Sequence, residues 1–418
     1  MLKRVMTFIL ALVMIAGIAF ALGACTKQEI PTETEKPAEN RYPIPKISIS
    51  GRIGGMKDKT DVRKIRVEYD DGERKFTAYA TLKVQGAHSL SYDKKNYTLH
   101  FYEDETYTKK KKIDMGWGPE NQYVLKANWV DKTKSRNVVT ARIAAKIYKK
   151  YGILENTPNN GTIDGYPVEV YQSGRFLGLY TLNIPKDSWL FNMDKNNPDH
   201  LAFCGYDWKP SARFLELPGY DAWELEVGEE NQENLDKLTR LFKFVLESSD
   251  KEFVRDFEEY MNKDAILNYV IFVETALLWD NNGKNMFLIT YDGKYWYPCF
   301  YDMDESWGSR YNGKVTMDYT PIPMTDENLL FRRVRTLFSK ELAERYFELR
   351  EDILTKESIM QEFYDFGAMI PKESFEKETE RWGENIPGFE YSQIEEYLDV
   401  RLPLLDAYMD GLLKGGKN

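Results

Sequence analysis

The chain has 418 residues, 14% of them aromatic, and a formal net charge of −10 at pH 7. A chain of this length can bury a sizeable core, as one large domain or as two lobes. Its acidic balance disfavours nucleic-acid binding through a general basic surface. Only three histidines are present, which argues against a histidine-ligated metal site.

The first residues predict a secretory signal. A basic start and an apolar run occupy residues 3–22, and the sequence Leu-Gly-Ala-Cys ends at Cys25. Such a segment is typical of exported proteins, and its end resembles a bacterial lipobox, in which cleavage leaves a lipidated cysteine. A single membrane-spanning anchor is the alternative. We expect residues 1–24 to be removed and the lipid on Cys25 to attach the protein to the outer face of a bacterial cell membrane.

The segment after the signal has no pattern of a folded element. Residues 25–45 are polar, contain prolines and show no periodic apolar spacing, which is typical of a flexible tether. Outside the cytoplasm, the remaining cysteines Cys204 and Cys299 could pair, although two cysteines alone do not establish a disulfide.

Apolar periodicity predicts strands first and helices later. Apolar and polar residues alternate over 65–69, 76–84 and 97–101, as in half-buried strands of an antiparallel sheet. Helical spacing is found at 134–151, at 231–278 with interruptions near 248–250 and 262–264, and from 325 to 413. A hairpin is expected at 167–182, between the first two helical stretches. This order predicts an α+β fold.

The segment 279–308 carries the most informative motif. Asp280 and Asn285 follow a long apolar run, and two short strands joined by Asp292-Gly293 come next. That dipeptide favours tight hairpin turns. The second strand ends directly at Asp302, so a hairpin would bring its two ends together.

This order of polar residues matches the one in protein kinases. There, a catalytic Asp accepts the proton of the acceptor hydroxyl, and a following Asn and a later Asp hold Mg²⁺. Carboxylate and amide oxygens are hard ligands, which Mg²⁺ prefers. The alternative is that these residues only cap helices or form turns, as Asp and Asn often do.

Four segments together are similar to the CotH family of spore-coat-type kinases, which are atypical protein-kinase-like enzymes. They lie in the family's order and are fairly specific as a set: 84–101, 123–137, 168–182 and 279–308. The resemblance implies a CotH kinase-like domain over 46–412 and a short tail at 413–418. It also implies a two-lobe arrangement, with an antiparallel-sheet N-terminal part and a largely helical C-terminal part.

The resemblance assigns a role to several residues. Lys95 is similar to the lysine that contacts the ATP phosphates, for which a long cationic side chain is suitable. Asp280 corresponds to the catalytic Asp, and Asn285 and Asp302 correspond to the metal ligands. Asp304 is either a second carboxylate ligand or a residue that fixes the loop.

Two further cations are candidates for phosphate binding. Arg136 could bind a phosphate bidentately or form a structural ion pair with Asp131, and the sequence leaves both open. Lys126 is a weaker candidate of the same kind. For Lys94, beside Lys95, we expect a strand-edge side chain that faces water.

The chain departs from the family where a Glu often follows the Gly-x-Tyr-x-Leu strand, here residues 178–182. A kinase-like Lys–Glu pair is therefore absent or supplied differently, and Glu169, Glu224 and Glu226 are candidates to replace it.

The sequence thus predicts a membrane-anchored, extracytoplasmic phosphotransferase. It would transfer the γ-phosphate of ATP to a Ser or Thr hydroxyl of a secreted or surface protein, with Mg²⁺ or Mn²⁺. One alternative is a non-catalytic surface scaffold of the same fold. The other is a metal-dependent nucleotide-sugar glycosyltransferase, because Asp302-Met-Asp304 also matches an Asp-x-Asp pattern; that class would favour a mainly parallel sheet.

Overall fold

The computed structural model describes residues 43–415, apart from 57, 87, 317–318 and 384–390. The predicted signal, Cys25 and most of the tether lie outside the described residues. All described residues belong to one compact unit. None of the helices in this part of the chain is long and apolar enough to span a bilayer.

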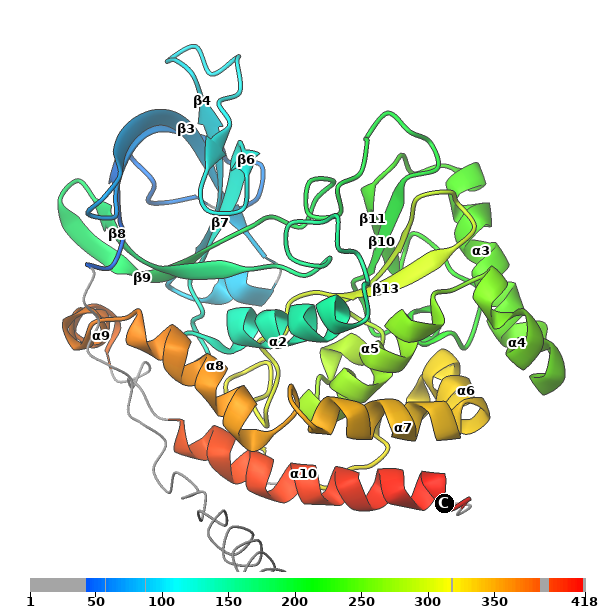
Figure 1. The fold of residues 1–418 in the computed structure, drawn as a ribbon. Coiled ribbons are helices and arrows are strands. Elements are labelled where there is room, and N and C mark those ends of the chain that lie inside the picture. Colours follow the sequence, from blue (N-terminus) through cyan, green and yellow to red (C-terminus); the bar gives the residue numbers. More distant parts are fainter. Residues whose placement is uncertain (1–42, 57, 87, 317–318, 384–390, 416–418) are drawn as a thin grey trace, which may run out of the picture. The chain divides into compact units, whose positions relative to one another are not determined.

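Seven strands of the first half close into a barrel (Figure 1). Neighbouring strands are antiparallel except β1 and β8, which pair in parallel and close the barrel. Alternate residues such as Ile65, Val67 and Leu82 are buried in a common core, which confirms the predicted strands. The order around the barrel is β1 (Lys46–Ser50), β2 (Arg63–Asp70), β3 (Lys75–Gln85), β4 (Asn96–Tyr102), β7 (Gln122–Lys126), β9 (Arg175–Asn183) and β8 (Gly165–Gln172).

A second, four-stranded sheet carries the predicted hairpin. Its order is β11 (Trp223–Val227), β10 (Leu201–Gly205), β12 (Met286–Thr290) and β13 (Trp296–Phe300), and all neighbours are antiparallel. Met286 pairs with Phe300 at the open end of the β12–β13 hairpin. Asn285, directly before Met286, and Asp302, two residues after Phe300, therefore lie at the same end of the sheet. A further sheet consists of two short strands, β5 (Ile113–Asp114) and β6 (Pro119–Glu120).

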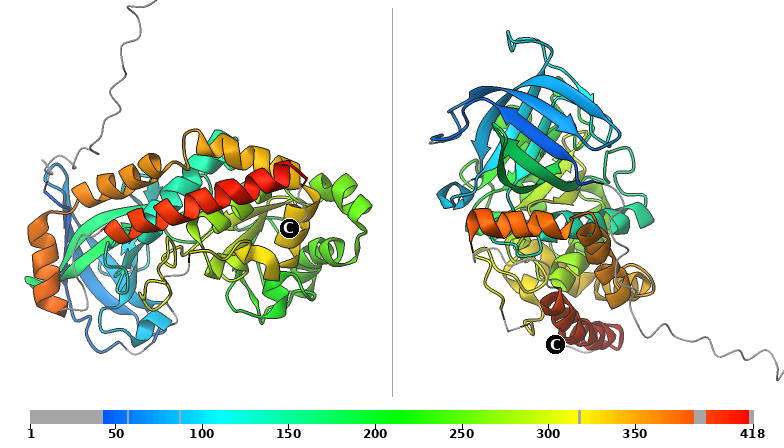
Figure 2. Two further views of the ribbon diagram at one scale, coloured as in Figure 1. Left: turned by 90° about the horizontal axis from the view of Figure 1, so that it is seen from below. Right: turned by 90° about the vertical axis from the view of Figure 1, so that its left-hand side faces the viewer.

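Helices cover the barrel and the four-stranded sheet. α2 (Arg136–Lys150) follows the barrel strand β7, α5 (Lys263–Ala276) packs on β13, and α9 (Lys372–Trp382) packs on β9 (Figure 1, Figure 2). The other α-helices are α3 (Gln232–Glu247), α4 (Asp250–Asp256), α6 (Leu329–Leu337), α7 (Ser339–Arg350), α8 (Lys356–Ala368) and α10 (Ser392–Leu413). Short 3-10 turns are η1 (His88–Ser91), η2 (Pro210–Arg213), η3 (Phe257–Glu259), η4 (Asp280–Asn282) and η5 (Met324–Glu327). The α+β class is confirmed.

The two described cysteines are buried and free. Cys204 and Cys299 both pair with Phe287, from opposite sides of β12. Two strand spacings of about 4.8 Å separate their backbones, whereas a disulfide needs Cα atoms about 4.4–6.8 Å apart. The pairing that the sequence allowed is therefore not formed.

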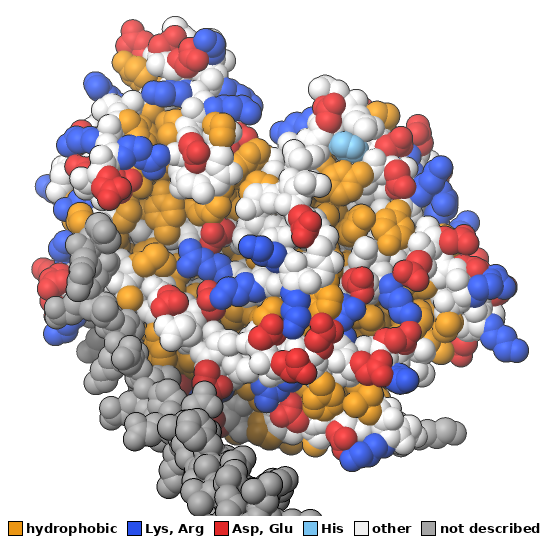
Figure 3. Space-filling view, in the orientation of Figure 1, with side chains coloured by type: hydrophobic (Ala, Val, Ile, Leu, Met, Phe, Trp, Pro, Cys, Tyr) orange, Lys and Arg blue, Asp and Glu red, His pale blue; other side chains and the backbone are white. Residues whose placement is uncertain are grey.

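Charged side chains of both signs are intermixed over the face shown in Figure 3.

Candidate active site

The structure brings Asp280, Asn285 and Asp302 together at the open end of the β12–β13 hairpin. The Asn285 amide Nδ2 lies 3.3 Å from Asp280 Oδ2 and 3.4 Å from the Asp302 carbonyl oxygen. Asn285 and Asp302 have φ values of 60° and 49°. Left-handed backbone at non-glycine residues is uncommon and is concentrated at functional sites.

A close backbone contact holds the turn between Asp280 and Asn285 in place. The Asn285 N–H donates to the Gly205 carbonyl at 2.6 Å. A Cβ atom at Gly205 would lie only 2.2 Å from the carbonyl oxygen of Gly283. Only glycine at position 205 permits this approach of β10 to the turn.

Three polar side chains face the acids. Lys284 Nζ donates to Asp280 Oδ2 at 2.7 Å, and Lys126 Nζ, from the end of β7, donates to Asp302 Oδ1 at 3.1 Å. Asn137, in the first turn of α2, contacts Asp302 Oδ1 at 3.3 Å and accepts the Met303 N–H at 3.0 Å. The barrel, α2 and the hairpin thus meet at Asp302.

Carboxylates outnumber their cationic partners at this site. Asp280, Asp302 and Glu305 pair with Lys284, Lys126 and Arg310. Asp304 has no ion pair among the described residues.

The pKa values reflect this crowding. Burial and then the charge of Asp302 hold the pKa of Asp304 well above its usual range. Burial and then Asp280 raise the pKa of Glu305 to about 7. At Asp302, burial is the largest single effect and favours the neutral form, but Lys126, Lys186 and Lys284 together outweigh it and lower the pKa.

The side chains at this site fit a divalent cation that takes only part of its ligands from the protein. Within the described residues, no three His, Cys, Asp or Glu side chains are placed to hold a metal ion by themselves. Mg²⁺ usually binds one or two carboxylates and completes its shell with water and substrate phosphates. This preference is matched by three oxygen ligands in a negatively charged site: Asp302, the amide of Asn285 and the unpaired Asp304.

Lys95 lies outside this group of contacts. Its ammonium donates to the carbonyl oxygens of Leu90, at 2.7 Å, and Tyr92. Its predicted contact with the ATP phosphates stays a prediction. Lys126, the weaker candidate from the sequence, is the one that contacts a predicted metal ligand.

Lys94 does not face water as expected; that expectation is wrong. Its side chain is fully buried in an ion pair with Glu378 of α9. It also donates to the Ala127 carbonyl at 3.2 Å, and its ammonium lies 4.4 Å from the centre of the Tyr180 ring. Glu378 in turn accepts the Leu179 N–H at 2.8 Å. The pair links α9 to the barrel. Burial removes both charges from water, so each charge is stabilised by the other.

The three candidate glutamates pair with lysines other than Lys95. Glu224, at 3.4 Å, and Glu226 pair with Lys186, and Glu169 pairs with Lys377 at 2.9 Å.

Lys186 and Lys284 are two cations near the site that sequence reasoning missed. Lys186 lies 4.9 Å from the centre of the Tyr301 ring, directly before Asp302. It follows the β9 strand closely, near the position where the family often has its Glu, and this was the available signal. Lys284 lies between Asp280 and Asn285 in the motif itself.

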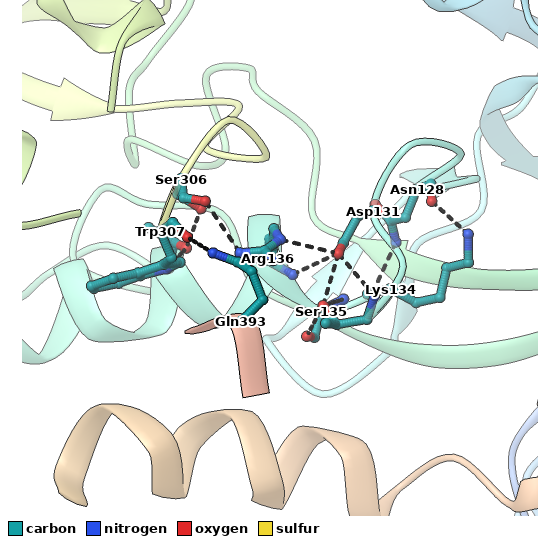
Figure 4. Close-up of polar contacts among 10 residues, drawn as sticks. Asn128, Asp131, Lys134, Ser135, Arg136, Ser306, Trp307 and Gln393 are labelled. Carbon is teal, nitrogen blue, oxygen red and sulfur yellow. Dashed lines mark hydrogen bonds and ion pairs between the residues drawn. The ribbon is translucent and has the colours of Figure 1, made fainter. Parts of the chain in front are cut away.

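Arg136 forms the structural ion pair that the sequence left open. Its Nε lies 3.4 Å from Asp131, Nη1 donates to the Ser306 carbonyl at 3.2 Å and Nη2 donates to Gln393 Oε1 at 2.6 Å (Figure 4). Asp131 also accepts the Arg136 N–H at 2.8 Å at the start of α2. The guanidinium therefore joins α2 to α10 and to the loop that follows Glu305.

Lys134 is a buried lysine beside this network (Figure 4). It is 1% exposed and donates to the Asn128 carbonyl at 2.7 Å. Burial, followed by the charge of Lys94, lowers its pKa from 10.5 to about 7. Between these two values the unfolded chain binds the proton and the folded chain releases it. Stability should therefore rise with pH inside this window.

We expect Lys134→Met to remove this rise. Relative to the variant, the wild type should gain about 1.4 kcal/mol of unfolding free energy per pH unit between pH 7 and 9. Urea unfolding at several pH values measures the difference. Lys132→Met, at an exposed neighbour, is the control and should show no such slope. A Lys134→Met profile parallel to the wild type would contradict the assignment.

The structure therefore defines an α+β protein with a carboxylate-rich site where a barrel and an antiparallel hairpin meet. The chain belongs to the CotH kinase family: the family model described as CotH kinase protein matches residues 82–404. The match spans every predicted site residue from Lys95 to Asp304, and Cys25 lies outside it. No curated protein matches the chain.

Proposed function

We propose that the protein is a phosphotransferase that moves the γ-phosphate of ATP to a Ser or Thr hydroxyl of a protein, with Mg²⁺ or Mn²⁺. The observation that carries this proposal is the meeting of Asp280, Asn285 and Asp302 in the chain order used by protein kinases. We further infer that the barrel and the helical part act as the two lobes of a kinase-like arrangement.

Asp280 is the proposed general base. The acceptor oxygen would attack the γ-phosphorus and lose its proton to the Asp280 carboxylate, while the bond from the γ-phosphorus to the bridging oxygen breaks and ADP leaves. Lys284 and Asn285 both donate to Asp280 Oδ2, which orients the carboxylate.

Asn285 and Asp302 would hold the metal, with Asp304 as a further ligand. The bound ion supplies charge neutralisation at the phosphates. Lys126 would add a fixed positive charge next to Asp302, and phosphoryl transfer depends mainly on such positioning and charge stabilisation. Lys95 is proposed as a second phosphate contact, whereas the contacts of Arg136 support a structural role.

Transfer of label from γ-labelled ATP tests the function. The full-length protein, Mn²⁺ or Mg²⁺ and a set of Ser/Thr-containing acceptor proteins should give labelled acceptor. Absence of transfer with every acceptor and both metals would favour the scaffold alternative. The mostly antiparallel sheets do not favour the glycosyltransferase alternative, which would place its nucleotide at the ends of parallel strands.

Asp302→Asn should weaken metal-dependent nucleotide binding at least about tenfold, since even the loss of partners behind a metal ligand costs 10–100-fold. The amide has the same shape but lacks the charge that attracts the ion. Calorimetric titration with ATP at fixed Mn²⁺ measures the change. Asp365→Asn, at an exposed position of α8, is the control. Wild-type affinity in Asp302→Asn would remove this residue from the metal site.

We also propose that the protein is anchored to the outer face of the cell membrane through Cys25, on the basis of its signal-like N-terminus. Mass spectrometry of the mature protein should find a lipid on an N-terminal Cys25, and Cys25→Ser should abolish it. A wild-type chain without lipid at this position would refute the anchor.

A further inference from the structure

The segment between β10 and β11 exposes an unusual number of large apolar side chains. The exposed fractions are 44% for Tyr206, 40% for Trp208, 42% for Leu215 and 46% for Leu217. Single exposed apolar residues are normal on protein surfaces. A concentration of them on one short segment marks an interaction site more often than chance exposure does.

The backbone of this segment is firmly anchored. Phe214, within the segment, is completely buried and stacks on Phe242 with ring centres 4.1 Å apart and planes 11° apart. The same ring packs edge-on against Trp223 at 6.3 Å. Because the segment is held by its own core residue, the exposed side chains are presented from a fixed frame, which lowers the entropy lost when a partner binds.

The segment packs directly against the proposed catalytic turn. A Cβ atom at Gly283 would lie 2.8 Å from the Ala212 carbonyl oxygen, so the two backbones are in contact. Tyr206 follows Gly205, whose carbonyl accepts the Asn285 N–H. A polypeptide bound along residues 206–217 would therefore lie beside the turn that carries Asp280.

The charges of the segment indicate what would bind. Its two cations are already paired, Lys209 with Asp221 at 2.6 Å and Arg213 with Glu327 at 2.7 Å. Asp207 and Glu216 are exposed and form no ion pair in the part of the chain that the structure describes. The unsatisfied charge next to the apolar side chains is thus negative, and electrostatic complementarity favours a positively charged partner.

We propose that residues 206–217 form a docking surface for the acceptor polypeptide. The surface would bind an extended segment with a large apolar side chain next to Lys or Arg, near the Ser or Thr that receives the phosphate. This inference rests on the proposed function and specifies its acceptor. Trp and Tyr supply much of the binding energy in many interfaces, so Trp208 and Tyr206 are the expected anchors.

A peptide array tests the docking surface. Each peptide carries one central Ser, and each flanking position is varied through all residue types. The array is incubated with the full-length protein, ATP and Mn²⁺, and it is read twice, by phosphate incorporated and by protein bound. The wild type should prefer an apolar residue at one flanking position and Lys or Arg beside it, in both readings.

Two variants and two controls separate the contributions. Trp208→Ser with Leu217→Ser should weaken the apolar preference about tenfold, as expected for loss of an interface anchor, and Asp207→Lys with Glu216→Lys should reverse the charge preference. The controls Val254→Ser on α4 and Leu404→Ser on α10 remove apolar side chains of similar exposure, 47% and 37%. They should change neither the apolar preference nor the charge preference.

The outcomes distinguish this inference from the proposed function. Phosphorylation without an apolar and basic preference, or with one that survives in both double variants, would overturn the docking surface and leave the function intact. Selective binding without phosphorylation would support the surface and contradict the function. If the array shows neither selective binding nor phosphorylation, both the docking surface and the proposed function are overturned. Self-association that the docking variants abolish, measured by sedimentation, would replace the acceptor by a second copy of this chain.

Discussion

Asp280→Asn is expected to abolish most phosphoryl transfer while nucleotide and metal binding remain. An amide has the shape of the carboxylate and can hydrogen-bond in the same place, but it cannot accept the hydroxyl proton. Loss of a general base lowers the rate by about 10²–10⁴-fold. Initial rates with γ-labelled ATP and one acceptor measure the effect, and calorimetric titration checks that ATP still binds.

The matched control for this change is Asp292→Asn, at the turn of the same hairpin. Asp292 Oδ1 accepts the backbone N–H groups of Lys294 and Tyr295, both at 2.8 Å, and an Asn side-chain oxygen can do the same. This variant should keep wild-type turnover. If Asp280→Asn behaves like the control, Asp280 is a structural turn residue and the proposed mechanism is wrong.

Removal of one partner of the Lys94–Glu378 pair is expected to have the largest effect on stability. Both side chains are 0% exposed, so Lys94→Met leaves the Glu378 charge buried without its cation, and Glu378→Gln does the same to Lys94. Breaking a buried pair in this way costs about 3–5 kcal/mol. The free energy of unfolding from urea denaturation, compared with the wild type, gives the value.

Two further variants show whether the charge is responsible. Lys94→Met combined with Glu378→Leu should recover much of the loss, because no unpaired charge stays buried. Lys340→Met breaks the exposed Lys340–Glu344 pair of α7 and should change stability by less than about 1 kcal/mol. Single variants at Lys94 and Glu378 that are as stable as Lys340→Met would contradict the structural role of the pair.

The sequence predicted those parts of the fold that depend on local patterns. Alternation located β2, β3 and β4, and Asp292-Gly293 located the hairpin, because neighbouring residues determine a strand face and a tight turn. Closure of the barrel depends on the parallel pairing of β1 with β8, which are more than a hundred residues apart. Such long-range pairings leave no signal in local periodicity.

The candidate site follows the same division. Asp280, Asn285 and Asp302 are joined by a single hairpin, so their proximity was predictable from the turn alone. The contact between Lys126 and Asp302 spans 176 positions, and the Lys94–Glu378 pair spans 284. Both depend on how β7 and α9 pack in three dimensions. Local patterns therefore rank Lys126 as the weaker candidate although it contacts Asp302, and they wrongly place the side chain of Lys94 in water.

The most direct measurement is a crystal structure of the protein with Mn²⁺ and a non-hydrolysable ATP analogue, with data collected for the anomalous signal of manganese. We expect a manganese peak bound by Asp302 and Asn285, with the γ-phosphate between the metal and Asp280. An analogue bound elsewhere, or with its γ-phosphate turned away from Asp280 and no manganese at Asp302, would contradict the proposed phosphotransfer site.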